Sequence, residues 1–266
     1  MEKPKISVLL CVYNPDKKQL YEAVKSILGQ TYANWEMILY DDGSEEPCKE
    51  WIYQMSYLDS RIRYVRNENH HSLAYGLNES LKLAKGKFIA RMDGDDISRP
   101  TRFEEQIQFL EENEVFLWVG SNIALIDEKG EHWGERQYAT IPKEKDFLKF
   151  SPYAHPTIMI HREELMNYGG YNTEKSPYRS EDYELFMRLH AAGEQGYNLQ
   201  EVLLDYRESK EGYKKRTLKF QFQEMLVRWE GFRKLRILDP ITLIYVIKPL
   251  LVWMIPNEVI YALKRM

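Results

Sequence analysis

Three carboxylates lie within four residues of this sequence, in the segment Asp93-Gly94-Asp95-Asp96 that follows the apolar run 88–92. Neighbouring carboxylates repel one another unless a cation lies between them. Mg²⁺ or Mn²⁺ meets this need, because such ions commonly take one or two carboxylates together with phosphate oxygens. The segment therefore predicts a site for a divalent metal and a diphosphate. The structural alternative is a solvated acidic loop that caps the next helix.

Two further acidic pairs could take part in chemistry. One carboxylate of Asp41-Asp42 could accept a hydrogen bond from a base N–H or a ribose hydroxyl, although an Asx turn around Gly43 is the alternative. Glu181-Asp182 could supply a general base for a hydroxyl group. Its structural alternative is a helix start with Ser180 as N-cap and acidic residues in the first turn.

The histidines give weaker signals. His155 could contact a substrate or a metal, but a single histidine is more often a packed or surface residue. His70-His71 lacks metal-ligand companions at suitable spacing and is interpreted as a loop. The sequence contains no HExxH, cysteine array, Walker loop or GxSxG motif, which excludes zinc proteases, P-loop NTPases and the usual serine hydrolases.

Strands and helices alternate through the first 112 residues. Short β-rich runs predict strands, and amphipathic segments between them predict helices, over strands 6–12, 35–40, 62–65 and 88–92 and helices 17–28, 46–58, 73–84 and 100–112. This order predicts an α/β fold with a mostly parallel central sheet flanked by helices. Ligands bind at the carboxyl ends of such strands, where Tyr13-Asn14, Asp41-Asp42 and Asp93-Asp96 all lie.

The rest of the chain is less regular. The patterns predict strands at 115–127, 132–140, 157–161 and 199–206, and helices at 142–150, 180–192 and 213–235. The long last helix is amphipathic and begins a C-terminal extension.

The length and net charge of the chain limit its possible functions. The 266 residues fit one large domain or one domain with an appendage, and the net charge of −4 argues against a nucleic-acid partner. From Arg207 to the end the chain carries 13 basic and 6 acidic residues, a net of +7, so the preceding part is net −11. An acidic body with a basic tail predicts a cation-binding site in the first part and an anionic surface contact in the second.

The cysteine count and the N-terminus indicate the compartment. Cys11 and Cys48 are too few for a disulfide scaffold, which is typical of a reduced cytoplasmic protein. The apolar run 6–12 is too short for a signal peptide or a membrane anchor.

In combination these segments resemble the family-2 glycosyltransferases, which have the GT-A fold. The resemblance covers about residues 5–207 and rests on the order and spacing of Ser7–Asn14, Ser26–Tyr32, Trp35–Ser44, Ala84–Asp96, Pro100–Phe103, Gly169–Tyr171 and Ser180–Leu185. It implies a GT-A catalytic domain over 1–207, with a nucleotide-sugar half at about 1–112 and an acceptor half at about 113–207. Residues 208–266 would form a helical extension.

The resemblance implies inverting transfer from a nucleotide-diphosphate sugar, expected to be a UDP-sugar, to a glycan or lipid-linked acceptor in surface polysaccharide synthesis. Asp182 matches the general base, and Asp95 with Asp93 matches the ligands of a Mn²⁺ or Mg²⁺ cofactor. The matching nucleotide-binding residues are Cys11, Tyr13, Asp42 and Asp93. Accessory or acceptor roles are assigned to Glu181, His155, Asp96 and Arg207.

The sequence departs from the family pattern in two places. Ser72 stands where many relatives carry Gly. Tyr206-Arg207 is followed by Glu208-Ser209, where many relatives carry His two residues after the Tyr-Arg pair. Phosphate neutralisation would then fall to Arg207, Lys210, Lys214 or Lys215.

Two other functions are compatible with parts of the pattern. A sugar-nucleotide pyrophosphorylase would need an early Gly-rich loop with a basic residue, and none occurs between Ile6 and Asp16. A non-catalytic nucleotide- or carbohydrate-binding module has no reason to retain Asp93, Asp95 and Asp182 together.

The segment 240–256 is strongly apolar and is interrupted only by Lys248-Pro249. A helix over 241–255 would be about 22 Å long, shorter than the ~30 Å of a bilayer core. We therefore expect contact with the cytoplasmic face of a membrane rather than a span, aided by Arg228, Arg233, Lys234, Arg236, Lys264 and Arg265. The alternatives are packing on the catalytic domain or a homodimer interface.

Overall fold

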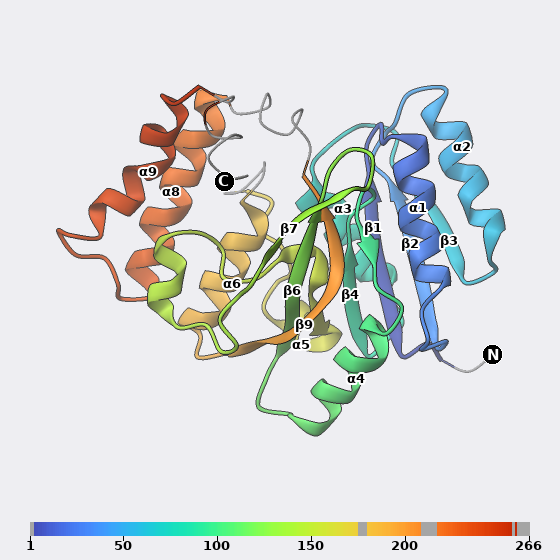
Figure 1. Cartoon of the computed structure of the whole chain (residues 1–266), viewed down its shortest axis with the longest axis horizontal. Coiled ribbons are helices and arrows are strands. Elements are labelled where there is room, and N and C mark those ends of the chain that lie inside the picture. The colour runs from blue at the N-terminus through green and yellow to red at the C-terminus, as the bar shows by residue number, and fades with distance from the viewer. Residues whose placement is uncertain (1–2, 175–179, 209–216, 257–258, 260–266) are drawn as a thin grey trace.

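The computed structural model describes residues 3–174, 180–208, 217–256 and 259. Within these residues nine strands form one sheet in the order β3-β2-β1-β4-β8-β6-β9-β5, with β7 paired to β6 (Figure 1). The strands are β1 (Ile6–Val12), β2 (Trp35–Asp41), β3 (Ile62–Arg66), β4 (Phe88–Met92), β5 (Ile97–Ser98), β6 (Trp118–Ile126), β7 (His132–Arg136), β8 (Met159–His161) and β9 (Gly196–Arg207).

The first four strands are parallel, as the alternating pattern predicts. β1 lies between β2 and β4, with Val12 opposite Asp41 and Leu10 opposite Met92, so the three strands end at the same edge. Beyond β4 the sheet is mixed, because β8 runs antiparallel to both β4 and β6 while β9 runs parallel to β6. The α/β class is confirmed, and the parallel arrangement holds for the first half only.

Helices cover both faces of the sheet. They are α1 (Lys17–Leu28), α2 (Cys48–Met55), α3 (Leu73–Leu83), α4 (Arg102–Glu112), α5 (Arg162–Asn167), α6 (Glu181–Ala191), α8 (Leu218–Lys234) and α9 (Leu243–Trp253), with 3-10 turns η1 (Ser56–Leu58), η2 (Glu144–Leu148) and η3 (His155–Thr157). Buried residues of α1, α2 and α4 pack on one face and those of α3, α5 and α6 on the other.

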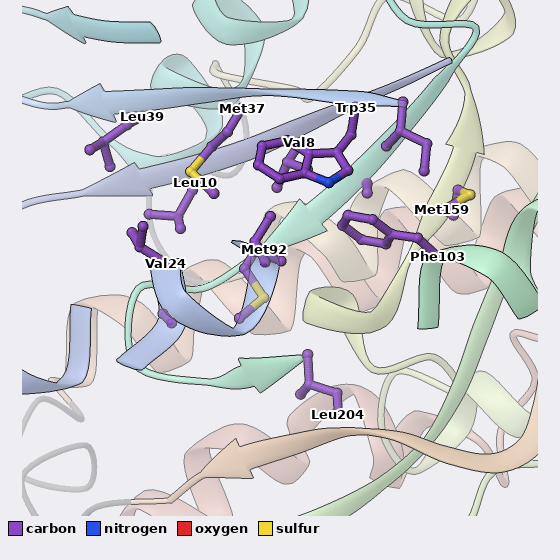
Figure 2. Close-up of a cluster of buried hydrophobic side chains, with 14 of the residues drawn as sticks. Val8, Leu10, Val24, Trp35, Met37, Leu39, Met92, Phe103, Met159 and Leu204 are labelled. Atoms are coloured by element: carbon purple, nitrogen blue, oxygen red, sulfur yellow. The ribbon is translucent and has the colours of Figure 1, made fainter. Parts of the chain in front are cut away.

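Strand alternation divides the core between these two faces. Val8 and Leu10 of β1 point into the cluster under α1 and α4, whereas Leu9 between them joins the opposite cluster. Figure 2 shows the first cluster, in which Trp35 and Phe103 pack beside the β1 side chains. Both faces of the central strands are buried, which explains their largely apolar sequences.

Several short elements differ from the sequence prediction. The helix predicted at 142–150 is only the 3-10 turn η2, and the strand predicted from residue 157 begins at Met159 after η3. The patterns missed α5 and β5, which have 6 and 2 residues respectively. Segments this short carry less than two periods of apolar spacing, so periodicity does not reveal them.

The C-terminal extension packs on the body of the protein through α8 (Figure 1). Gly231 of α8 lies against Met187 of α6, and Val227 and Phe232 join the cluster on that face. In turn α9 packs on α8 through Val246. Part of segment 240–256 therefore packs on the rest of the protein, which is one of the alternatives to membrane contact. The domain boundary near residue 207 stays a prediction.

None of the helices in the described part of the chain combines the length and the apolar character needed to cross a membrane.

Candidate active site

The carboxyl ends of β1, β2 and β4 bring together most of the residues singled out from the sequence. Asp42 follows β2 and donates its main-chain N–H to the Val12 carbonyl at 2.9 Å, while Asp93 follows β4. Cys11 of β1 lies between them, and the negative charges of both carboxylates raise the pKa of its thiol. The predicted convergence at one sheet edge is therefore present.

Asp42 lies at the centre of a small polar group beside Tyr13. One oxygen, Oδ2, accepts the main-chain N–H of His71 at 3.0 Å and lies 2.9 Å from Nδ1 of His70. The other oxygen, Oδ1, is buried and has no hydrogen-bond partner among the described residues. The His70 ring stacks on Tyr13 with 3.8 Å between centroids. An aromatic surface and a free acceptor thus lie side by side.

The loop that carries the two histidines depends on Gly43. This glycine has φ +81°, and a Cβ there would lie 2.7 Å from the carbonyl carbon of Asn69. Only glycine allows both the backbone angle and this approach. The sequence pattern does not single out His70, because this residue has no metal-ligand companions at suitable spacing. Its contact with Asp42 depends on the path of the loop past Gly43, which no local motif reveals.

The two adjacent aspartates at the end of β2 have different contacts. Asp41 is fully buried and accepts hydrogen bonds from the Arg66 guanidinium at 2.5 Å, the Tyr64 hydroxyl at 2.9 Å and the Ser44 main-chain N–H at 2.8 Å. These contacts satisfy Asp41 within the protein. Asp42 is therefore the residue of the pair that keeps a carboxylate oxygen without a partner among the described residues.

Cys11 and Ser72 have local structural partners. The Cys11 thiol lies 3.6 Å from the Ser80 hydroxyl of α3, and burial raises its pKa to about 12, so it is neutral. Ser72 is the N-cap of α3 and accepts the Tyr75 main-chain N–H at 3.3 Å. This cap accounts for serine at a position where glycine would leave the helix end without a side-chain acceptor.

Asp93, Asp95 and Asp96 form the acidic cluster, in which one carboxylate oxygen from each residue lies within 4.8 Å of the others. Partial desolvation by the surrounding walls and the charge of Asp93 raise the pKa of Asp95 to about 6, although Asp95 retains exposed surface. Burial and both neighbours raise the pKa of Asp96 well above its usual value. Oδ2 of Asp96 is buried without a partner among the described residues. Close oxygen ligands, mutual repulsion and an unpaired buried oxygen fit a hard divalent cation.

Two arginines contact the residues of this acidic cluster. Arg91 is buried and forms an ion pair with Asp93. Arg207 donates its main-chain N–H to Asp96 at 2.8 Å and its Nε to the Asp95 carbonyl at 2.8 Å, and it pairs with Glu22 at 2.8 Å. Arg207 therefore holds the acidic loop in place. The other predicted phosphate ligands, Lys210, Lys214 and Lys215, lie outside the described residues.

Asp182 shares a cleft of about 1050 Å³ with the acidic cluster. It is half-buried in the first turn of α6, and the Ser180 side chain forms no cap hydrogen bond there. Burial and the neighbouring Glu181 carboxylate raise the pKa of Asp182 to about 7, against the opposing effects of the Tyr183 main-chain N–H and Arg91. A carboxylate with this pKa can accept a proton near neutral pH.

His155 also lines the cleft, but its side chain is held within the protein. Its Nε2 lies 2.9 Å from the Tyr171 hydroxyl, and burial with the nearby Arg91 charge lowers its pKa well below the usual value. The Tyr171 main chain is fixed in turn by two hydrogen bonds to the Asn78 side chain, at 2.9 and 2.8 Å. A neutral, positioned His155 suits packing or hydrogen bonding rather than charge.

Several cleft residues carry no motif and were not found from the sequence. Arg136 and Tyr138 lie near Asp182, and Lys149 and Lys248 line the same cleft. They come from β7, the segments after β7 and η2, and the C-terminal helix α9. Only the tertiary structure brings these separate segments to one wall.

Comparison with known proteins gives consistent results. The family model described as Glycosyl transferase family 2 matches residues 7–169. The chain is 35% identical over 266 residues to "Putative glycosyltransferase EpsE" of Bacillus subtilis, covering 98% of this chain and 94% of that protein. It is 32% identical over 247 residues to an Escherichia coli protein named "UDP-Gal:alpha-D-GlcNAc-diphosphoundecaprenol beta-1,3-galactosyltransferase", covering 87% of this chain and 85% of that protein.

Two further similarities concern a surface-glycan protein and a solved structure. "O-antigen biosynthesis glycosyltransferase WbnJ" of E. coli is 35% identical over 208 residues, covering 76% of this chain and 79% of that protein. The crystal structure of S. aureus TarS 1–349 in complex with UDP-GlcNAc superposes with a TM-score of 0.65 at 17% identity, covering 94% of this chain and 72% of that chain. This structural likeness supports the GT-A fold.

Proposed function

The chain belongs to glycosyl transferase family 2, and we propose that it transfers a sugar from a UDP-sugar to a hydroxyl of a glycan or lipid-linked acceptor, with inversion at the anomeric carbon. One observation carries this proposal: Asp93 and Asp95 line the same cleft as Asp182. The cleft thus has carboxylates for a metal-bound diphosphate and a separate carboxylate for an acceptor. The names of the E. coli relatives support a role in surface polysaccharide synthesis.

The group around Asp42 is proposed to bind the base of the donor. Its free Oδ1 can accept a base N–H, and uracil offers one at N3. Tyr13 and His70 supply aromatic surface for stacking. The buried neutral thiol of Cys11 would line the floor of this pocket.

Asp95 and Asp93 are the proposed ligands of Mn²⁺ or Mg²⁺, with Asp96 close by. A bound ion supplies positive charge that stabilises the leaving diphosphate. Arg91 holds Asp93, and Arg207 holds the Asp95 carbonyl and the Asp96 carboxylate, so the chain fixes the acidic loop before any ligand arrives. Such preorganisation lowers the cost of charge reorganisation during the reaction.

Asp182 is the proposed general base. It takes the proton of the acceptor hydroxyl as the hydroxyl oxygen forms its bond to the anomeric carbon. The bond between that carbon and the diphosphate oxygen breaks at the same time, and its electron pair leaves with UDP. No covalent enzyme intermediate is required.

Calorimetry with UDP and turnover of UDP-sugars test this function. A thermal-shift screen with Mn²⁺ first selects the nucleotide sugar, and release of UDP is then measured. UDP should bind in the presence of Mn²⁺, and Asp95→Asn should weaken this binding, whereas Glu163→Gln on α5, an 83% exposed carboxylate, should not. Metal-dependent UDP binding without any turnover would instead indicate a non-catalytic binding module.

We also propose that the C-terminal extension contacts the cytoplasmic face of a membrane. Leu218, Phe222, Leu226 and Trp229 are exposed along α8 at one-turn spacing, and α9 exposes a similar series. Arg233, Lys234 and Arg236 are exposed and suit anionic head groups. Arg228 is buried and paired with Glu224 at 2.8 Å, so it belongs to the fold instead, and Lys264 and Arg265 lie outside the described residues.

Flotation with anionic vesicles separates membrane contact from a homodimer. Full-length protein should float, and Ile247→Asp should reduce flotation because it puts a charge on the exposed apolar face of α9. Val115→Asp is the matched control, since Val115 is 69% exposed on another part of the protein. A dimer that stays in the aqueous fraction would contradict the membrane proposal.

A further inference from the structure

The cleft wall contains a pair of lysines that the proposed catalytic roles leave unused. Lys149 follows η2, and Lys248 lies in α9, where its Nζ donates a hydrogen bond to the main-chain carbonyl of Lys149 at 2.6 Å. Both lysines line the cleft that holds Asp182. This contact makes the C-terminal extension part of the active-site wall.

The surroundings of this lysine pair are positively charged. Lys248 is half-buried, and burial together with the charges of Arg228 and Lys149 lowers its pKa, against the opposing charge of Glu224. Glu224 is already paired with Arg228 at 2.8 Å. Among the described residues, neither lysine forms an ion pair with a carboxylate. Lys149 is exposed and Lys248 is partly desolvated, and a bound anion stabilises two positive charges that lie close to one another.

The pair is held by a rigid set of contacts next to the general base. Arg228 of α8 donates to the main-chain carbonyls of Leu148 at 3.0 Å and Tyr245 at 3.4 Å, which fixes both segments that carry the lysines. Its guanidinium also lies over the Tyr183 ring, 5.0 Å from the centroid, and Tyr183 follows Asp182 in α6. Arg228 thus connects the two segments that carry the lysines to α6, which carries Asp182.

An apolar surface begins beside Lys248. Ile244, Ile247 and Leu251 are exposed on α9 at spacings of three and four residues, which places them on one face. Lys248 follows Ile244 by four residues and therefore lies at the border between this face and the cleft. An anionic group at Lys248 could continue directly into a hydrocarbon chain lying along α9.

We propose that Lys149 and Lys248 form the binding subsite for the diphosphate of a lipid-linked acceptor. The diphosphate binds at the cleft rim, the hydrocarbon chain lies on the apolar face of α9, and the sugar reaches the cleft, where its hydroxyl meets Asp182. This inference rests on the proposed function and deepens it, because it identifies the acceptor as a lipid diphosphate. It also explains why the extension packs against the catalytic body.

Farnesyl diphosphate is the probe, with binding to the full-length chain measured by calorimetry. EDTA is present throughout, so that the diphosphate cannot bind through a metal at the acidic cluster. Inorganic pyrophosphate and farnesol test the two halves of the probe separately. Farnesyl diphosphate should bind more tightly than either, since it alone has both groups.

Charge removal tests the two lysines. Loss of one charge-assisted phosphate contact should weaken binding of farnesyl diphosphate about tenfold in Lys149→Met. This variant keeps the Lys248 hydrogen bond, which uses a main-chain carbonyl. Lys248→Met should act in the same direction and Lys248→Arg should retain binding. Lys145→Met on η2 is the matched control, because Lys145 is exposed and its change should alter binding by less than about twofold.

The outcomes distinguish this inference from the proposed function. If Mn²⁺-dependent UDP binding is intact but Lys149→Met binds farnesyl diphosphate like the wild type, the subsite is wrong and the proposed function stands. Equal binding of pyrophosphate would overturn the lipid assignment, and equal binding of farnesol would overturn the diphosphate assignment. If the wild-type protein does not bind UDP in the presence of Mn²⁺, the proposed function itself is refuted.

Discussion

Replacement of Asp182 by Asn gives the sharpest test of the proposed mechanism. The amide keeps the size of the side chain but cannot accept the acceptor proton, so turnover should fall by about 10²–10⁴-fold. Asp182 lies in α6, whereas the proposed nucleotide and metal residues Asp42 and Asp93 follow strands of the sheet. UDP binding with Mn²⁺ should therefore be unchanged, which separates a lost base from a misfolded site.

The raised pKa of Asp182 adds a prediction for the wild type. With a pKa of about 7, the carboxylate is the active form, and activity should rise with pH through that value. The ionised fraction grows from about one tenth at pH 6 to about nine tenths at pH 8, so the rate should increase about ninefold over this range. Release of UDP at acceptor concentrations well below KM provides the assay, because kcat/KM reports the pKa of the protein before the acceptor binds.

Glu181→Gln tests the cause of the raised pKa. It removes the neighbouring negative charge, so the midpoint of the pH profile should move to lower pH. Burial remains, so the midpoint should stay above the usual value for Asp. Glu163→Gln should leave the profile in place. Near-normal turnover in Asp182→Asn, or a rate that does not change between pH 6 and 8, would refute the assignment of Asp182.

Three other results are expected. UDP affinity measured by calorimetry should fall about tenfold or more when EDTA removes the metal, since Asp93 and Asp95 would then repel the diphosphate; equal affinity would rule out a metal-bridged diphosphate. Gly43→Ala should cost about 1–3 kcal/mol in urea unfolding, because it strains a backbone with φ +81°; an unchanged midpoint would contradict this. Gly86→Ala should lower the melting temperature and cost about 1–3 kcal/mol, since its Cβ would lie 2.5 Å from the main-chain nitrogen of Ser7 in β1; an unchanged melting temperature would contradict this overlap.

Local sequence patterns were enough to predict the first half of the sheet and the acidic loop. Largely apolar runs of 5–7 residues indicated β1, β2 and β4, and each run leads into polar residues. Parallel strands place their carboxyl ends together, so the meeting of Tyr13, Asp42 and Asp93 followed from local patterns alone. Order and spacing of the motifs also identified the family correctly.

Tertiary contacts, and not local sequence, distinguish two adjacent aspartates. Asp41 and Asp42 are adjacent and identical in type, but Arg66 and Tyr64 of β3 satisfy Asp41. His70 and Tyr13 are far apart in sequence, yet their rings stack at 3.8 Å. These pairings depend on strand order and loop path, which local propensity does not encode.

The contact between Lys149 and the C-terminal helix α9 arises from packing alone. Lys149 and Lys248 are 99 residues apart in sequence and carry no motif, and their contact exists because α9 packs on α8 and α8 on the body. The apolar composition of segment 240–256 predicted a buried or membrane-facing surface but not which side chains face which way. The packing of α9 buries Val246 and Pro249 and leaves Ile244, Ile247 and Leu251 exposed. This packing decides which side chains face the protein. Contacts between distant segments arise from the whole fold, and no short stretch of sequence specifies them.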